Sequence, residues 1–151
     1  MSRFRILVAD QAEAVFYDAA ALDQAPTEVA RINSPEARLH DRDLASDRPG
    51  RSYESVGGAR HSISREVGPH RRQAELFARR VARRLDEARR RDEFEGLVVV
   101  AGPPFLALMR KELPRLTRAR VTHEICKDLV HGPLDALRRH LGAIAAEGPR
   151  G

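Results

Sequence analysis

The sequence predicts an α/β protein in which a mixed five-stranded sheet is covered by three main helices. Three strand-like segments follow one another closely near the N-terminus, and helical and strand-like patterns alternate in the second half of the chain. A length of 151 residues with 42% hydrophobic residues is sufficient for one domain with a buried core. We therefore expect a single α/β domain over residues 1–146, followed by a frayed tail over residues 147–151.

The first three strands are predicted from short segments rich in β-forming residues. Phe4–Ala9 is an apolar run that ends at Asp10, which is typical of a strand buried on both faces. Ala14–Ala20 (AVFYDAA) and Thr27–Ile32 supply the second and third strands. Because the connections between them are short, we expect an antiparallel meander.

A basic amphipathic helix is predicted from Pro69 to Arg91. Apolar residues recur there every three or four positions, at Ala74, Phe77, Val81, Leu85 and Ala88. Pro69 suits the first turn of a helix. The same stretch holds nine arginines against three acidic residues, so its outer surface is expected to be strongly cationic.

The C-terminal half is predicted to continue as strand, helix, strand and helix. Leu97–Ala101 (LVVVA) has the unbroken apolar character of a central parallel strand. A helix is expected over Phe105–Leu113, a strand over Arg120–Cys126, and a final helix that opens at Pro133.

The order of these elements predicts the topology of the sheet. Right-handed crossovers place the fourth strand beside the first and the fifth outside it, which gives the order 3-2-1-4-5. Only the second strand is antiparallel to the others in this arrangement, which is ribonuclease H-like. The carboxyl ends of the other four strands then share one edge, where ligands bind in open α/β sheets. The helix after Gly102-Pro103-Pro104 is expected to offer free backbone N–H groups to an anion at this edge.

A long polar loop is predicted between the third strand and the basic helix. Ser34–Gln73 shows almost no apolar periodicity, and loops of this length are either functional or disordered. We expect a functional loop over residues 34–65, in which Arg-Asp hydrogen bonds hold Leu39–Arg51 in a defined conformation while a tip over residues 52–64 remains mobile. The loop and the sheet edge together predict one binding site, formed by Asp10, His40, Asp41, Arg42, Asp43, Arg48, Arg51, Gly57, Gly58, Arg60, His61, His70, Gly102, Lys127 and Asp128.

The charge of the chain indicates a polyanionic partner but does not establish one. The formal net charge is +5 and the pI is about 10.3, with arginine supplying nearly all of the positive charge. Arginine favours bidentate contacts with phosphate, although a general arginine bias would give the same composition without any ligand. An RNA-binding surface is predicted on the basic helix at Arg72, Arg79, Arg80, Arg83, Arg84, Arg90 and Arg91.

The sequence favours few other kinds of chemistry. Its histidines and carboxylates lack the helical spacing of a metal site, so we expect neither a metal nor a cofactor. Asp10 has the position of a first nuclease carboxylate, but no convincing partners follow on strands. Cys126 is the only cysteine, which excludes an internal disulfide and fits a reducing compartment. With no signal peptide or membrane-spanning segment recognisable, a cytoplasmic location is expected.

Five motifs carry a resemblance to a known family: PEARLHDRDLASDRPGRS, GGARH, GPHRRQAELFARRVARRL, LVVVAGPPFLALMRKEL and KDLVHGPLDALRRHL. Together and in this order they resemble the bacterial host attachment proteins, which are proteins required for attachment to host cells. That family is distantly similar to the central domain of archaeal and eukaryotic peptide-chain release factors, which carries a Gly-Gly-Gln loop before its long basic helix. Here Gly57-Gly58 is followed by Ala59, which has no side chain to position a hydrolytic water.

The resemblance implies a release factor-like module that binds RNA, either tRNA or the ribosome, without hydrolysing peptidyl-tRNA. The alternative is an interaction protein that contributes to host attachment through a protein or surface partner. The sequence leaves the oligomeric state and any residual hydrolase activity open.

Overall fold

The computed structural model describes residues 3–34 and 56–147, and for residues 56–70 it describes the backbone alone. Five strands form one mixed sheet in the predicted order β3-β2-β1-β4-β5. They are β1 (Phe4–Ala9), β2 (Glu13–Ala19), β3 (Thr27–Asn33), β4 (Gly96–Ala101) and β5 (Val121–Ile125). The described residues also form four helices, which are α2 (Val56–Arg90), α3 (Pro103–Glu112), α4 (Arg115–Arg118) and α5 (Leu134–Glu147).

β1 is the central strand of the sheet, and its pairings with β2 and β4 show how the strands run. It pairs antiparallel with β2, matching Val8 with Val15, and parallel with β4, matching Val8 with Val100. β2 pairs antiparallel with β3, and β4 pairs parallel with β5. Only β2 therefore runs against the other strands, as predicted.

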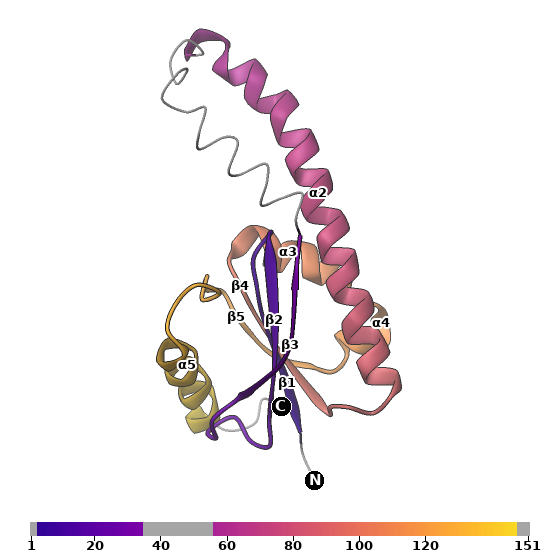
Figure 1. Ribbon diagram of the computed structural model, residues 1–151, viewed down its shortest axis with the longest axis vertical. Coiled ribbons are helices and arrows are strands. Elements are labelled where there is room, and N and C mark those ends of the chain that lie inside the picture. Colours follow the sequence, from indigo (N-terminus) through magenta and orange to yellow (C-terminus); the bar gives the residue numbers. More distant parts are fainter. Residues whose placement is uncertain (1–2, 35–55, 148–151) are drawn as a thin grey trace.

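Successive side chains of the central strands point to opposite faces of the sheet, and a hydrophobic core lies on each face. Leu7 of β1 and Val99 of β4 pack against α2 and α3, whereas Ile6 and Val98 pack against α5. Figure 1 shows α2 and α4 on one side of the sheet and α5 on the other. The central strands are buried on both faces, which explains why their sequences are continuously apolar.

Helix α2 begins earlier than predicted. It starts at Val56 rather than Pro69, so residues 56–65, expected to belong to the loop, are helical. Proline in a helix interior removes one N–H donor, but helix elongation adds one hydrogen bond per residue and can continue beyond such a position. Figure 1 shows the N-terminal part of α2 extending past the edge of the sheet.

The short helix α4 was also not predicted. Its four residues are too few for a periodic pattern, and the prediction of three main helices did not include it. Thr117 of α4 is fully buried and donates a hydrogen bond to Asp86 of α2 at 2.7 Å. This contact between distant residues, rather than a local pattern, accounts for its place in the fold. None of the helices in the described part of the chain is long and apolar enough to cross a membrane.

Candidate functional site

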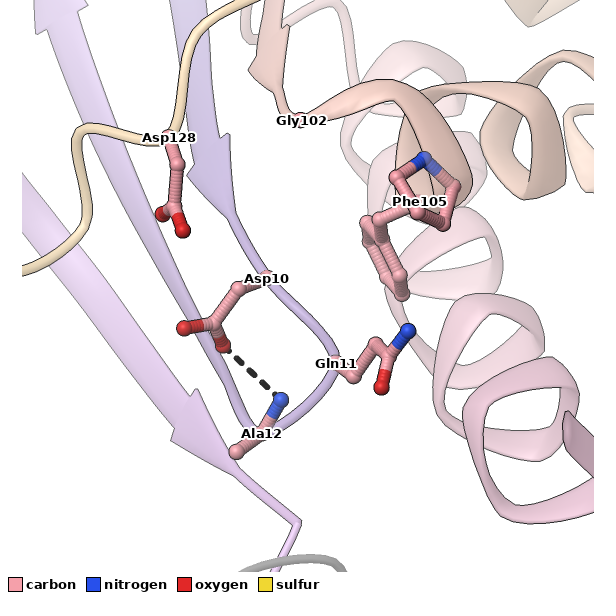
Figure 2. A pocket seen from close by; sticks show the side chains of 7 residues that line it. Asp10, Gln11, Ala12, Gly102, Phe105 and Asp128 are labelled. Carbon is pink, nitrogen blue, oxygen red and sulfur yellow. Dashed lines mark hydrogen bonds between the residues drawn. The ribbon is translucent and has the colours of Figure 1, made fainter. Parts of the chain in front are cut away.

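The carboxyl ends of the parallel strands meet at a pocket of about 250 Å³. Asp10 follows β1, Gly102 follows β4, and Asp128 follows β5, and all three line it. The sequence predicted that these three residues would gather at one sheet edge, and the structure brings them together. Figure 2 shows the carboxylates of Asp10 and Asp128 on one side of the pocket and Phe105 on the other. The remaining lining residues are Gln11, Ala12 and Pro104.

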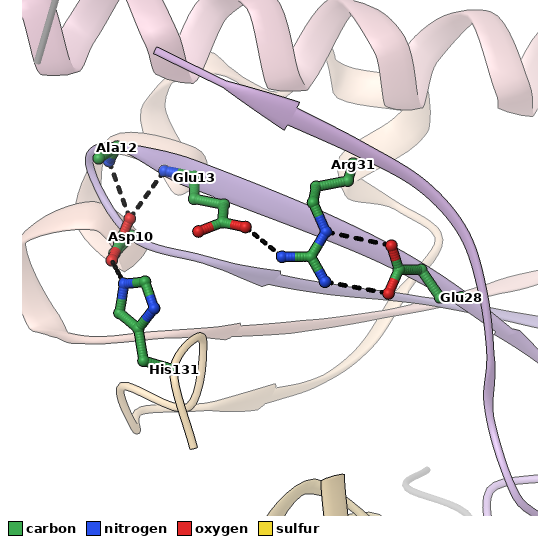
Figure 3. Close-up of polar contacts among 6 residues, drawn as sticks. All are labelled: Asp10, Ala12, Glu13, Glu28, Arg31 and His131. Carbon is green, nitrogen blue, oxygen red and sulfur yellow. Dashed lines mark hydrogen bonds and ion pairs between the residues drawn. The ribbon is translucent and has the colours of Figure 1, made fainter. Parts of the chain in front are cut away.

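Asp10 holds the turn between β1 and β2. Its Oδ1 accepts hydrogen bonds from the backbone N–H groups of Ala12 and Glu13, both at 2.8 Å. Its own backbone N–H donates to the Glu13 carbonyl at 2.9 Å. The second carboxylate oxygen lies 3.6 Å from Nε2 of His131, an exposed residue that sequence reasoning did not single out (Figure 3). Much of the hydrogen-bonding capacity of Asp10 therefore serves the fold.

A charged network continues from this turn onto the edge strand β3. Figure 3 shows Arg31 between Glu13 and Glu28; it donates to Glu28 at 3.0 and 3.1 Å and also to Glu13. The hydrogen bond from Arg31 lowers the pKa of Glu28, and both carboxylates raise the pKa of Arg31. Burial, followed by the nearby charge of Glu28, raises the pKa of Tyr17. The network joins β3 to β2 beside the pocket.

The start of α3 offers fewer backbone N–H donors to an anion than the expected site requires. Pro103 and Pro104 occupy its first two positions and have no N–H, so Phe105 supplies the first backbone donor of the helix proper. Gly102 has ordinary extended geometry, and a Cβ atom added there would lie 3.9 Å from Cβ of Asp128, which is normal contact. With the carboxylates of Asp10 and Asp128 on its wall, the pocket is acidic and disfavours phosphate.

The other predicted residues of this site are only partly described. Lys127 lies at the same edge and is exposed, but it is not among the described residues that line the pocket. Two groups of predicted residues lie outside what the structure describes in side-chain detail. His40, Asp41, Arg42, Asp43, Arg48 and Arg51 fall outside the described residues, and Gly57, Gly58, Arg60, His61 and His70 lie on the α2 backbone. In the described part of the chain, no group of three or more His, Cys, Asp or Glu residues could hold a metal ion.

A second candidate surface runs along the face of α2 that points away from the sheet. The buried stripe of this helix includes Phe77, Val81 and Leu85. Helical spacing places a second row of side chains on the opposite face. This row, which we call the outer stripe, consists of Arg72, Leu76, Arg79, Arg83 and Arg90, all of them exposed.

Arginines of the outer stripe differ in how they are bonded. Arg79 lies 3.3 Å from Glu112 of α3, and Arg90 lies 3.0 Å from Asp86. Arg72 and Arg83 have no hydrogen-bond or ion-pair partner among the described residues. No described residue therefore competes with an external ligand for either arginine. Leu76, whose exposed fraction is 49%, was not predicted at this surface, although its helical spacing with Arg72 and Arg83 is readable in the sequence.

The remaining predicted arginines contact the protein itself. Arg80 donates to the backbone carbonyl of Asn33 at 3.0 Å, and its guanidinium lies 5.7 Å from the ring centroid of Phe77. The guanidinium of Arg84 lies at the same distance from the ring of Phe16. These two side chains cover the edge of the core between α2 and the sheet. Beyond the helix end, Arg91 lies 4.0 Å from Glu93.

Comparison with known proteins agrees with the family resemblance. A family model described as "Protein required for attachment to host cells" matches residues 5–141, which is most of the chain. No curated protein matches the sequence.

Proposed function

The chain belongs to the family of proteins required for attachment to host cells, and within that family we propose that it is a non-catalytic RNA-binding module that associates with tRNA or the ribosome. The observation that carries the proposal is the outer stripe of α2. Arg72 and Arg83 are exposed there without partners among the described residues, on the face opposite the buried stripe. Exposed arginines along one face of a helix suit the phosphate backbone of a nucleic acid.

The order of motifs along the chain supports the proposed binding of RNA. It is similar to that of the release factor domain, in which a glycine-containing loop precedes a long basic helix. Ala59 follows Gly57-Gly58 in this chain, so the proposal includes no hydrolysis of peptidyl-tRNA. A role at tRNA or the ribosome would place the protein in the cytoplasm.

The acidic pocket suggests how the two candidate surfaces divide their roles. Phosphates would be repelled by Asp10 and Asp128 and attracted by the outer stripe, so the stripe would carry the main RNA contact.

Binding of tRNA titrated in salt, together with co-sedimentation with ribosomes, tests the proposal. We expect tRNA affinity to fall steeply with salt, with a logarithmic slope of roughly 0.7 to 0.9 per phosphate contacted. The double variant Arg72→Gln/Arg83→Gln should flatten this slope by roughly one unit per arginine, because both charges are free to contact phosphates.

The matched control is Arg138→Gln/Arg139→Gln, which removes the same charge from exposed positions of α5 on the other face of the sheet. This control should leave the slope close to that of the wild type. An equal loss in both double variants would mean that only net charge matters, and the outer stripe would then be an ordinary solvated face.

The family description favours a second candidate, an interaction with a protein or surface partner during attachment. Leu76 supports it, because a half-exposed leucine among arginines can contribute an apolar contact to a protein interface. Fractionation of the native cell separates the two candidates. Recovery mainly at the outer surface would put the interaction protein first, whereas recovery with ribosomes would favour RNA binding.

A further inference from the structure

We infer that the outer stripe of α2 is built for base-paired RNA rather than for single strands, an inference that rests on the proposed RNA-binding function. Two observations on different parts of the molecule lead to it. One is the burial of the aromatic side chains, and the other is the spacing of the exposed arginines along a rigid helix.

Aromatic side chains in the described residues are not placed to stack on unpaired bases. Proteins that bind single strands present aromatic faces, and each stacked base contributes about 1 to 3 kcal/mol. Here Phe77, Phe94 and Phe105 are at most 2% exposed, and every phenylalanine and tyrosine among the described residues is buried or half-buried. The ring of Phe77 is also partly covered by the guanidinium of Arg80. The described surface therefore offers no exposed phenylalanine or tyrosine ring on which unpaired bases could stack.

The arginines of the outer stripe form a straight row with fixed intervals. Arg72, Arg79, Arg83 and Arg90 follow one another after seven, four and seven residues, which corresponds to about 10, 6 and 10 Å at the rise of an α-helix. Phosphates of a duplex are already held in place by base pairing, so several can meet such a row without further ordering. A flexible single strand must lose conformational freedom to do the same.

The ion pairs within the row do not prevent this contact. Arg79 and Arg90 have side chains that are 52% and 69% exposed, although their carboxylate partners Glu112 and Asp86 are only 13% and 9% exposed. Each guanidinium can keep its carboxylate partner and still donate to a phosphate through the N–H groups that face solvent. A duplex also carries a higher density of negative charge than a single strand, which strengthens the attraction.

The test compares one RNA duplex of about 16 base pairs, the length spanned by a typical double-strand reader, with one of its strands alone. Fluorescence anisotropy is measured with the full chain at about 50 to 200 mM salt. We expect the duplex to bind at least about tenfold more tightly, which corresponds to one or two additional phosphate contacts. Arg72→Gln/Arg83→Gln should remove most of this preference, and Arg138→Gln/Arg139→Gln should retain it.

A variant that adds a positive charge tests the inference through a gain of binding, which damage to the fold could not produce. Leu76→Arg adds a cation at an exposed position inside the row, and it should raise duplex affinity and steepen the salt slope by roughly one unit. Single strands that bind as tightly as the duplex, or more tightly, would overturn the inference and leave the proposed function standing. If neither RNA binds at low salt, the proposed function itself fails.

Discussion

At the scale of single residues, a buried carboxylate joins two helices that are distant in sequence. Asp86 of α2 accepts a hydrogen bond from Thr117 at 2.7 Å and another from Arg89 at 3.1 Å. Its second oxygen lies 3.0 Å from Arg90. The hydrogen bond from Thr117, followed by that from Arg89 and the charge of Arg90, lowers the pKa of Asp86 below its ordinary value of 3.8, although burial acts in the opposite direction.

The lowered pKa predicts how this residue contributes to stability at different pH. The ionised form is favoured in the folded state, so the contribution is present above about pH 4 and is lost as the pH falls through the folded-state pKa. Asp86→Asn should lower the free energy of unfolding by about 1 to 3 kcal/mol at neutral pH. Urea unfolding at several pH values should show the difference from wild type shrinking below about pH 4.

Glu87→Gln is the control for this prediction, because it removes a neighbouring but exposed carboxylate of the same helix. Its stability should stay close to that of the wild type throughout. A constant difference between Asp86→Asn and wild type down to pH 2 would show that the charge of Asp86 is not the source of the effect.

At the scale of elements, the end of α2 depends on one residue in a left-handed conformation. Asp92 has φ of 58°, and its N–H donates to the Arg89 carbonyl at 2.9 Å. The N–H of Glu93 donates to the Ala88 carbonyl at 3.0 Å. These two bonds form a C-terminal capping motif whose left-handed position usually holds glycine. The cap turns the chain from the basic helix into β4 at the centre of the sheet.

Glycine at this position should therefore stabilise the protein. Asp92 is exposed, so its replacement mainly changes the backbone preference. We expect Asp92→Gly to raise the free energy of unfolding by about 0.5 to 1 kcal/mol, since relief of the left-handed strain exceeds the added entropy of the unfolded chain. Asp92→Ala should lower it, because alanine tolerates this conformation less well than aspartate. Thermal or urea unfolding measures the free energy of unfolding of Asp92→Gly and Asp92→Ala. Equal stabilities of the two variants would contradict the role of the left-handed residue in capping α2.

At the scale of the whole molecule, stability is concentrated at the centre of the sheet. β1 and β4 have a strand on each side and a core on each face, and five of the six residues of β1 and all six of β4 are buried. β3 lies at an edge, and its seven residues are exposed or half-buried. The surfaces that could contact partners, the pocket and the outer stripe, surround this rigid centre.

Amide hydrogen exchange should reproduce this gradient. Amides of β1 and β4 should exchange only when the whole molecule unfolds, whereas those of β3 should exchange faster through local opening. Exchange measured by NMR or mass spectrometry under native conditions checks the order. Equal protection of β3 and β1 would indicate that the edge strand is covered in solution.

The sequence by itself determined the order and direction of the strands, because continuous apolar runs and short connections are local properties of the chain. It also predicted that Asp10, Gly102 and Asp128 would meet, since parallel strands bring their carboxyl ends to one edge. Element boundaries mostly agree within one or two residues. The start of α2 and the presence of α4 escaped prediction, because weak apolar periodicity in one and short length in the other give no clear local signal.

Only the tertiary structure decided which charged groups remain available to a ligand. In the sequence, the arginines of the basic helix look alike. In the fold, Arg79 meets Glu112, which is 33 positions away, and Arg80 meets the backbone of Asn33, which is 47 positions away, whereas Arg72 and Arg83 find no partner among the described residues. The acidity of the pocket likewise depends on two carboxylates from distant strand ends. Electrostatic partners are set by proximity in space, and a linear pattern does not contain that information.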